Sequence, residues 1–269
     1  MNMALSAIHQ HDFTIIQISD THLMDQEHLA FAQSNPAETL KAVLTDIKQR
    51  YPHADAIFHT GDLAQVAVDC TYQYYLNLMH SLAIAHYQIP GNHDDLTLFP
   101  FHQGSDQVHA IHLGQWTIIL LNSAVDNEIY GCISSTQLQQ LESLLKQYSQ
   151  QHIILTCHHH PFEIQSKWID QHMLKNADHF TAMLTRHMHI KAVLFGHVHQ
   201  ESWQNWNDIQ FYSTPSTCIQ FKPNSDIFAL DQAAPGYRVL HLSKNGHFKT
   251  EIHRIENAII SINPNISGY

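Results

Sequence analysis

Five short apolar segments of this chain each end in a cluster of Asp, Asn, His and Gly residues. The segment from Thr14 to Ile18, with the sequence TIIQI, has the length and the β-branched content of a buried strand. In open α/β sheets, functional sites form beyond the carboxyl ends of the strands. The sequence therefore predicts one site that several strand ends build together. The five clusters are Asp20-Thr21-His22, Gly61-Asp62, Gly91-Asn92-His93-Asp94, His158-His159-His160-Pro161 and Gly196-His197-Val198-His199.

Helices are predicted between the strands. Asn35-Pro36 places proline at the first position of a helix over 36–51, and Ser134 with Gln137 forms the capping box of a helix that runs to about 149. Two more helices are expected over 69–83, which carries apolar residues on one side, and near 177–188. Strands are predicted over 14–18, 54–59, 85–89, 108–113, 116–121, 152–157 and 190–195, with a third set of short strands at 209–213 and in a hairpin over 237–254 that turns at Lys244-Asn245-Gly246.

Strands that alternate with helices are typical of the α/β class, and the hairpins add antiparallel pairs. The expected architecture is a four-layer αββα sandwich, in which helices flank two mixed β-sheets. No internal repeat, low-complexity tract or linker divides the 269 residues, so a single domain over 1–269 is predicted. The segment 200–236, which contains three prolines, is expected to form an irregular lobe on its surface.

The composition limits the partners and the location of the protein. With a formal net charge of −11 and only 13 Lys and Arg residues, the chain is a poor match for nucleic acid, whereas a small phosphorylated molecule fits if a bound metal inverts the local field. No apolar run is long enough to span a membrane, and the start MNMALSAIHQHDF lacks the features of a signal peptide. Four widely spaced cysteines suit a reducing compartment, so a cytoplasmic location is expected. The oligomeric state does not follow from the sequence.

The ligand chemistry of the five clusters indicates metal ions. Their side chains offer nitrogen and oxygen atoms but no thiolate, which suits iron, manganese or zinc in a catalytic role. The spacing in Asp20-Thr21-His22 puts two ligands beyond one strand end, and the glycines of the other clusters are expected to let the backbone bend sharply before the ligands. Seven ligands are too many for one tetrahedral ion but suffice for two ions that share one carboxylate.

The same clusters resemble the signature of the calcineurin-like metallophosphoesterase superfamily, which has a double β-sandwich flanked by helices. Five further stretches are similar to those of the bacterial class III 3′,5′-cyclic AMP phosphodiesterases, the CpdA type, and this similarity extends from about Phe13 to Tyr269. The resemblance implies a hydrolase that converts cyclic AMP to 5′-AMP with two divalent metal ions, Fe²⁺ or, as the main alternative, Mn²⁺. The stretches are HLMDQ, WIDQHMLKNADHF, STPSTCIQFKP, APGYRVLHL and the terminal SGY.

The resemblance also implies a role for each residue of the clusters. His158 is preferred over His159 and His160, because it comes first after the apolar strand, and the other two are expected beside the ligands or toward the substrate. The first metal is assigned to Asp20, His22 and His199, the second to Asn92, His158 and His197, and the bridge between them to Asp62, while the substrate is expected to meet His22, Asp62, Asn92, His93 and His199.

A hydroxide held between the two metals is the expected nucleophile. His93, which follows the ligand Asn92, is expected to donate a proton to the leaving 3′ oxygen of the ribose, or alternatively to orient a ligand. Asp94 is expected either to orient His93 or to form a turn. Phosphoproteins are disfavoured as substrates, because the Asp-Arg pair that follows Gly-Asp in phosphoprotein phosphatases is missing after Asp62.

Two other functions agree with the same residues. One is the hydrolysis of another small phosphodiester or of a nucleotide-sugar pyrophosphate by the same metal site. The other is a metal store or sensor without catalysis, suggested by the 25 histidines but not by ligands placed singly at strand ends. Trp168, Phe162 and Phe221 are candidates for stacking on adenine, although core packing explains each of them equally well.

Overall fold

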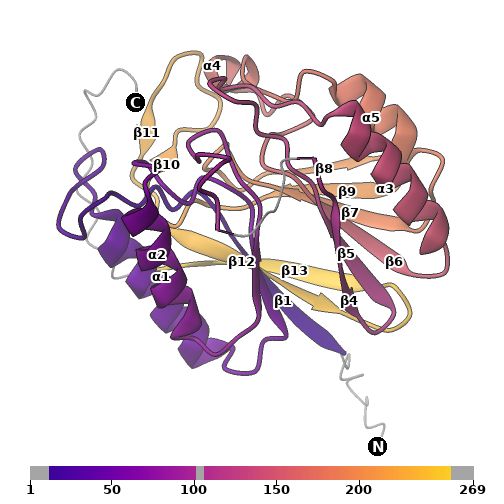
Figure 1. Cartoon of the computed structure of the whole chain (residues 1–269), viewed down its shortest axis with the longest axis horizontal. Coiled ribbons are helices and arrows are strands. Elements are labelled where there is room, and N and C mark those ends of the chain that lie inside the picture. Colours follow the sequence, from indigo (N-terminus) through magenta and orange to yellow (C-terminus); the bar gives the residue numbers. More distant parts are fainter. Residues whose placement is uncertain (1–11, 101–105, 256–269) are drawn as a thin grey trace, which may run out of the picture.

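The computed structural model describes residues 12–100 and 106–255, and these form two β-sheets that pack face to face. The first residues of the chain and the terminal SGY lie outside these ranges. In Figure 1, α1 (Pro36–Arg50) and α2 (Asp69–His80) lie on the outer side of one sheet, while α3 (Ser135–Gln147) and α5 (Ala177–Leu184) lie on the outer side of the other. The predicted αββα sandwich is therefore confirmed.

The first sheet contains five strands in the order β13-β12-β1-β2-β3. Its three strands β1, β2 and β3 are parallel, with Ile18 opposite His59 and His59 opposite Gln88, so their carboxyl ends lie at one edge. The predicted hairpin joins this sheet antiparallel to β1 instead of forming part of a third set of strands. The bounds are β1 (Phe13–Ile18), β2 (Ala56–His59), β3 (His86–Gln88), β12 (Gly236–Leu242) and β13 (Phe248–Arg254).

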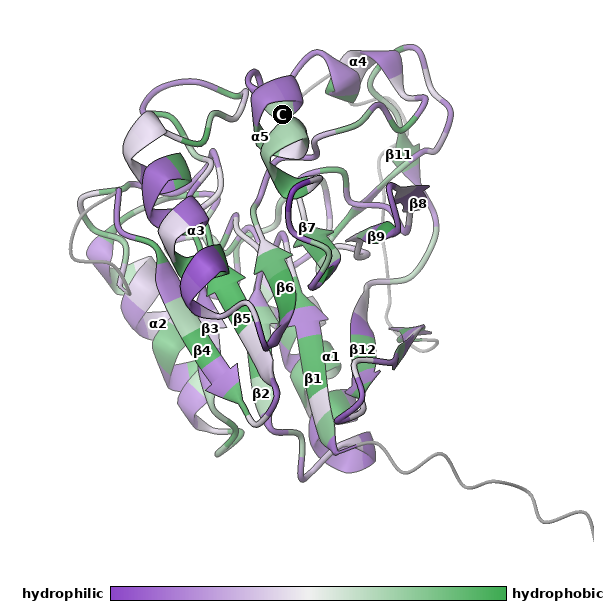
Figure 2. Cartoon of the chain, turned by 90° about the vertical axis from the view of Figure 1, so that its right-hand side faces the viewer, coloured by the Kyte–Doolittle hydropathy of each residue, from purple (hydrophilic) through white to green (hydrophobic). Residues whose placement is uncertain are grey.

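The second sheet contains six strands in the order β4-β5-β6-β7-β9-β8. Its strands β5, β6, β7 and β9 are parallel, and β4 and β8 pair antiparallel at the two edges. Figure 2 shows β5, β6 and β7 as predominantly hydrophobic, as expected for strands that are covered on both faces. The bounds are β4 (His109–Leu113), β5 (Trp116–Leu120), β6 (His152–Thr156), β7 (Ile190–Phe195), β8 (Trp203–Trp206) and β9 (Ile209–Ser213).

The segment 200–236 is more ordered than the sequence predicts. Strands β8 and β9 extend the second sheet, and β10 (Gln220–Phe221) pairs with β11 (Leu230–Asp231) in a two-stranded ribbon. The sequence WQNW of β8 lacks the run of apolar residues that predicts a buried strand. In the structure, three of its four side chains are exposed and the fourth is half-buried. The short helix α4 (Lys167–Asp170) is also absent from the prediction.

Apolar side chains between the sheets hold the two halves together. Ile15, Phe58 and Trp116 are fully or almost fully buried in this middle layer, and the Trp116 Nε1–H donates to the carbonyl of Ser243 at 2.9 Å. Burying one such side chain contributes about 1.5–3 kcal/mol. One polar group crosses the same layer, because the Gln17 amide on β1 donates to the carbonyl of Phe195 on β7 at 3.0 Å. The sheets are therefore fixed against each other close to their carboxyl ends.

No helix in the described ranges has the length and apolar character that crossing a bilayer requires. The four cysteines, which all lie in these ranges, form no disulfide.

The predicted capping box of α3 is only half correct. Ser134 is the N-cap, and its hydroxyl accepts from the amide of Gln137 at 3.2 Å. The Gln137 side chain does not return to Ser134. Instead, its amide accepts from the Asn122 N–H at 2.9 Å and donates to the Asn122 carbonyl at 2.8 Å. Gln137 therefore anchors the loop after β5 to α3.

We expect Gln137→Ala to destabilise the protein more than Ser134→Ala. Removal of the cap costs about 1 kcal/mol. Removal of the glutamine takes two hydrogen bonds from the buried Asn122 backbone and costs about 2–3 kcal/mol. Urea unfolding of the two variants measures the difference, and an equal or smaller loss for Gln137→Ala would contradict this role.

Candidate metal centre

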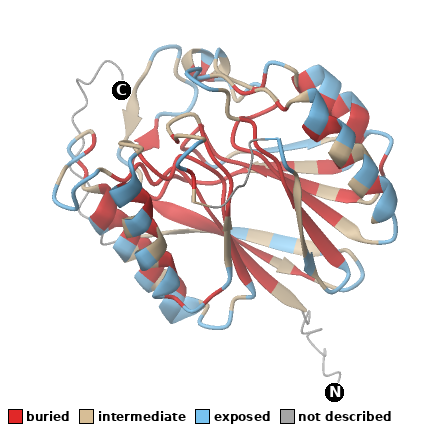
Figure 3. Cartoon of the chain, in the orientation of Figure 1, coloured by how far each residue is buried: buried red, intermediate tan, exposed pale blue. Residues whose placement is uncertain are grey.

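The five predicted clusters meet at one point, where the carboxyl ends of both sheets converge. Asp20, Asp62 and Asn92 follow strands of the first sheet, while His158 and His197 follow strands of the second. Figure 3 shows the loops beyond these strand ends as largely buried. Residues from distant parts of the sequence therefore share one enclosed site, as predicted.

One group of ligand atoms comes from the loops after β1 and β7. The Nε2 atoms of His22 and His199 are 3.0 Å apart, and the His199 Nε2 atom is 3.4 Å from Asp20 Oδ1. All three side chains are fully buried. Their ligand atoms lie within 4.8 Å of one another, close enough to surround one cation.

A second group surrounds His158, and Asp62 lies between the two groups. The His158 Nε2 atom is 3.2 Å from Asn92 Oδ1 and 3.3 Å from Asp62 Oδ2. The same Asp62 oxygen is 3.7 Å from His22 Nε2. The rings of His158 and His197 are 5.0 Å apart. The carboxylate of Asp62 thus faces both groups, which is the position that a shared ligand requires.

Three histidines of the site have one ring nitrogen fixed by the protein. The Nδ1 atom of His158 is 2.7 Å from the Thr60 carbonyl, that of His199 is 2.9 Å from the Ile219 carbonyl, and that of His22 is 2.8 Å from Gln65 Oε1. Because each partner is an acceptor, Nδ1 carries a proton, and Nε2 is the nitrogen that faces the site and can bind a cation once it is deprotonated. Such outer contacts orient metal-binding histidines in known sites. The sequence does not reveal these partners, since two of them are backbone carbonyls.

Some buried polar atoms of the site have no hydrogen-bond partner. Both ring nitrogens of His197 are buried without a hydrogen-bond partner, and the buried Asp62 Oδ2 has only its ion contacts with His158 and His22. Leaving such groups unpaired costs about 1–3 kcal/mol each. A cation would satisfy them, and nitrogen and oxygen donors suit iron, manganese and zinc. The residues present therefore fit a pair of divalent metal ions.

The backbone of the site is strained. Five of the seven predicted ligands have φ between 46° and 69°, a region that non-glycine residues seldom occupy. Strain of this kind costs of order 1–3 kcal/mol per residue and persists where the surrounding structure imposes it, commonly at functional sites. The five residues are Asp20, His22, Asp62, His197 and His199.

The glycines of the clusters have a different role from the predicted one. Only Gly61, with φ of 101°, bends the backbone in the expected way. Gly91 and Gly196 are required for space: a Cβ on Gly91 would be 2.7 Å from Asp62 Cγ, and a Cβ on Gly196 would be 2.7 Å from the Thr60 carbonyl oxygen. The ligands rather than these two glycines take the left-handed conformation.

The electrostatics of the site favour bound positive charge. Burial alone would raise the pKa of Asp62, but His158, His93 and His22 together hold it well below its usual value. Burial would lower the pKa of His158, but the neighbouring Asp62 raises it to about 9. In the absence of metal, a proton on His158 therefore provides the positive charge that the Asp62 carboxylate attracts. Burial lowers the pKa of His22 to about 3, which leaves its ring neutral and able to act as a ligand.

The other two histidines of the His158-His159-His160 run are engaged elsewhere. His159 lies near His158 and His197, but Ser123 Oγ and the Ile129 carbonyl occupy its two ring nitrogens at 2.9 and 3.0 Å. His160 Nε2 lies 3.2 Å from Asp170 Oδ1, and its ring stacks on His197 at 5.6 Å. Of the three, His158 alone directs a ring nitrogen at Asp62 within 4.0 Å.

His93 lies beside the two groups and is partly exposed. Its backbone N–H donates to Asp62 Oδ1 at 2.9 Å, and its ring meets the edge of the His22 ring at 4.9 Å. The His93 side chain also comes close enough to His22 and Asp62 to count as a possible ligand. Burial lowers the pKa of His93, although Asp62 opposes this effect.

Asp94 joins two of the ligand loops. Its carboxylate accepts hydrogen bonds from the backbone of Gly91, Leu63 and Ala64 and from the Tyr72 hydroxyl, at 2.9–3.2 Å. Burial and the nearby Asp62 raise its pKa to about 7. The contact with Gly91 belongs to a turn, which was one of the two roles expected for Asp94. The contacts with Leu63 and Ala64 connect the Asp62 loop to the Asn92 loop.

Aromatic rings pack against the histidines of the site. Phe221 is fully buried and stacks on His199 with the ring centroids 3.9 Å apart, and Phe31 stacks on His22 at 5.1 Å. Trp168 contacts the edge of Phe221 at 4.9 Å. Phe221 is therefore a packing residue and is not available to stack on adenine, while Phe162 lies in a separate cavity with Phe211.

Comparisons with known proteins agree with this geometry. Residues 13–201 match the calcineurin-like phosphoesterase family. The chain is 38% identical over 259 residues to the 3′,5′-cyclic adenosine monophosphate phosphodiesterase CpdA of Escherichia coli strain K12, covering 95% of this chain and 94% of that protein. It is 34% identical over 245 residues to a 3′,5′-cyclic-nucleotide phosphodiesterase of Nostoc sp., covering 90% and 92%.

A solved structure confirms the fold. The crystal structure of a dimetal phosphatase from Danio rerio superimposes with a TM-score of 0.69 at 13% identity, covering 91% of this chain and 97% of that one. At this identity the likeness concerns the fold alone.

We expect Asp62→Asn to reduce the metal content from about two ions per chain to at most one. The amide keeps the size of the side chain but loses the charge that faces both groups. Inductively coupled plasma mass spectrometry of the purified variant measures this loss. Asp126→Asn, in an exposed loop, is the matched control. Two ions in the Asp62 variant would show that this carboxylate is not shared.

Proposed function

This chain belongs to the calcineurin-like phosphoesterase family, and on that basis we propose that it hydrolyses 3′,5′-cyclic AMP to 5′-AMP. The fold alone does not define a substrate, because many reactions occur on this architecture. The proposal is supported by similarity over nearly the full chain to a protein named for this reaction, together with the seven donor residues, of which all except the half-buried Asn92 are buried.

We propose that the seven donors hold two divalent ions. When bound, such ions offset the charge of a phosphate and lower the pKa of water, so that hydroxide is available at neutral pH. Fe²⁺ is proposed as the native metal, with Mn²⁺ as the alternative, since the nitrogen and oxygen donors suit both. The first ion is assigned to Asp20, His22 and His199, the second to Asn92, His158 and His197, and the bridge to Asp62.

His93 is proposed to donate the proton that the leaving 3′ oxygen of the ribose needs. It is partly exposed, whereas the ligand histidines are buried, so a substrate can reach its ring. Burial favours the neutral ring, and the negative charge of a bound phosphodiester would favour the protonated one. His22, Asp62, Asn92 and His199 surround the same space and are proposed to orient the phosphate. Asp94 keeps the His93 loop in place through its backbone contacts.

Arginine contributes nothing to this proposed site. All four arginines of the chain lie in the described ranges and are engaged elsewhere. Arg50 and Arg186 pair with Asp46 and Glu142. Arg238 donates to the Ser213 carbonyl, and Arg254 donates to that of Ala234. Charge on a bound phosphate is therefore left to the cations and the histidines.

Chromatography of the reaction products tests the proposed substrate. The metal-loaded protein is incubated with cyclic AMP, with cyclic GMP, with a glycerophosphodiester and with a nucleotide-sugar pyrophosphate at equal concentrations, with and without a chelator. We expect 5′-AMP from cyclic AMP at the highest rate and none with the chelator. Faster turnover of the pyrophosphate or the glycerophosphodiester would contradict the proposal.

We expect His93→Ala to retain both metals and to lower kcat by about 10²–10⁴-fold with a smaller effect on KM. The metals are expected to remain because the contact from residue 93 to Asp62 is made by the backbone, which the substitution leaves in place. Steady-state kinetics and metal analysis of the same preparation measure both quantities. Loss of a metal ion would instead identify His93 as a ligand.

A further inference from the structure

A cavity lies on the outer side of the six-stranded sheet, and the seven donors of the metal centre do not line it. Its volume is about 460 Å³, within the range of small-molecule sites. None of its nine lining residues belongs to the seven donors. Phe195 and Phe211 at its base are part of the core between this sheet and its helices, so the cavity lies at that face.

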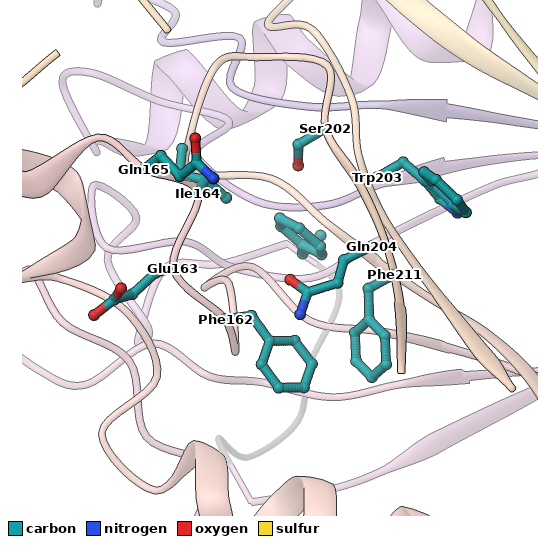
Figure 4. A pocket seen from close by; sticks show the side chains of 9 residues that line it. Phe162, Glu163, Ile164, Gln165, Ser202, Trp203, Gln204 and Phe211 are labelled. Carbon is teal, nitrogen blue, oxygen red and sulfur yellow. The ribbon is translucent and has the colours of Figure 1, made fainter. Parts of the chain in front are cut away.

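The base of the cavity is aromatic and its rim is polar. The rings of Phe162 and Phe211 meet edge to face at 4.9 Å, and Phe195 is 4% exposed. Figure 4 shows the Gln204 side chain extending toward the Phe162 ring, with Gln165 on the opposite side of the cavity. An aromatic base with a few polar groups around it is the usual composition of a ligand site.

One residue of the rim has an uncommon backbone conformation. Gln165 has φ of 64°, in the left-handed region that non-glycine residues seldom occupy. The Trp203 ring, in contrast, lies on the other face of the sheet, since Trp203 pairs with Tyr212 and its Nε1–H donates to Gln210 Oε1 at 2.7 Å, so only its backbone side borders the cavity.

The charges and the amides indicate the class of ligand. Glu163 is the one charged residue among those that line the cavity, so a phosphate group is disfavoured. Glutamine amides carry a donor and an acceptor side by side and match the edge of adenine, and aromatic rings stack on any nucleobase. Glu163 can accept from an exocyclic amine. Together these groups suit an uncharged purine better than a nucleotide.

We propose that this cavity binds an uncharged purine, as the free base or the nucleoside. Two of its lining residues are neighbours of the metal centre in sequence: Phe195 directly precedes Gly196-His197, and Phe162 follows Pro161 after the His158–His160 run. The binding site itself does not depend on the proposed reaction.

Calorimetric titration of the metal-loaded protein with adenosine, adenine and uridine tests the proposal. We expect adenosine and adenine to bind more tightly than uridine. In the double variant Gln165→Ala/Gln204→Ala the affinity for adenosine should fall at least about tenfold. Gln147→Ala, an exposed glutamine at the end of α3, serves as the control and should leave binding unchanged. Phe162→Leu, which removes an aromatic ring that lines the cavity, is a second variant and should also weaken binding.

Several results would overturn the proposal. Absence of adenosine and adenine binding up to about 1 mM would refute it. Equal affinity of the wild type, the double variant and Phe162→Leu would place any bound adenosine elsewhere, for example at the metal centre. The KM for cyclic AMP should stay within about twofold in the double variant. Because binding is measured without turnover, failure of the proposed reaction would leave this test intact.

Discussion

The carboxylate of Asp62 is the contact on which the arrangement of the site depends. It extends from the first sheet and reaches His158 of the second at 3.3 Å, while its other oxygen accepts the backbone N–H of His93 at 2.9 Å. Three loops thus take their position from one side chain. Close below, the Gln17 amide connects the same two sheets, and the Asp94 carboxylate fixes the Asp62 loop to the next one. The site is rigid because its parts hold one another.

This rigidity has an energetic cost. Five strained ligand residues and several unpaired buried atoms lower the stability of the metal-free chain. The apolar layer between the sheets and the two outer cores offset that cost, since dozens of side chains are fully buried there. Ions that bind only the folded chain would raise its free energy of unfolding and so offset part of this cost. The strained residues therefore lie in the loops beyond the strand ends, whereas the apolar side chains that stabilise the fold lie between the sheets and under the helices.

Much of this organisation could be predicted from the sequence. The strands over 190–195 and 209–213 have the predicted bounds, and the helix predicted over 36–51 ends at Arg50, because apolar periodicity and capping residues are local signals. Convergence of the five clusters follows from the rule that parallel strands end at one edge. The partners of the histidines do not follow, because Thr60 and Ile219 act through backbone carbonyls. The contact of Gln137 with the Asn122 backbone could not be predicted either, because the two residues are 15 positions apart. Strand β8 was not predicted because its sequence lacks an apolar pattern.

The position of β12 in the first sheet determines when, during synthesis, that sheet can be completed. This strand, Gly236–Leu242, pairs with β1 and separates it from the edge hairpin strand, although more than two hundred residues lie between the two in the chain. A nascent polypeptide on the ribosome has all seven donors once residue 199 is made, yet the first sheet, which presents four of them, still lacks strands β12 and β13. Cations held as proposed would then bind only after nearly the whole polypeptide has emerged, which would make their binding a late event after synthesis.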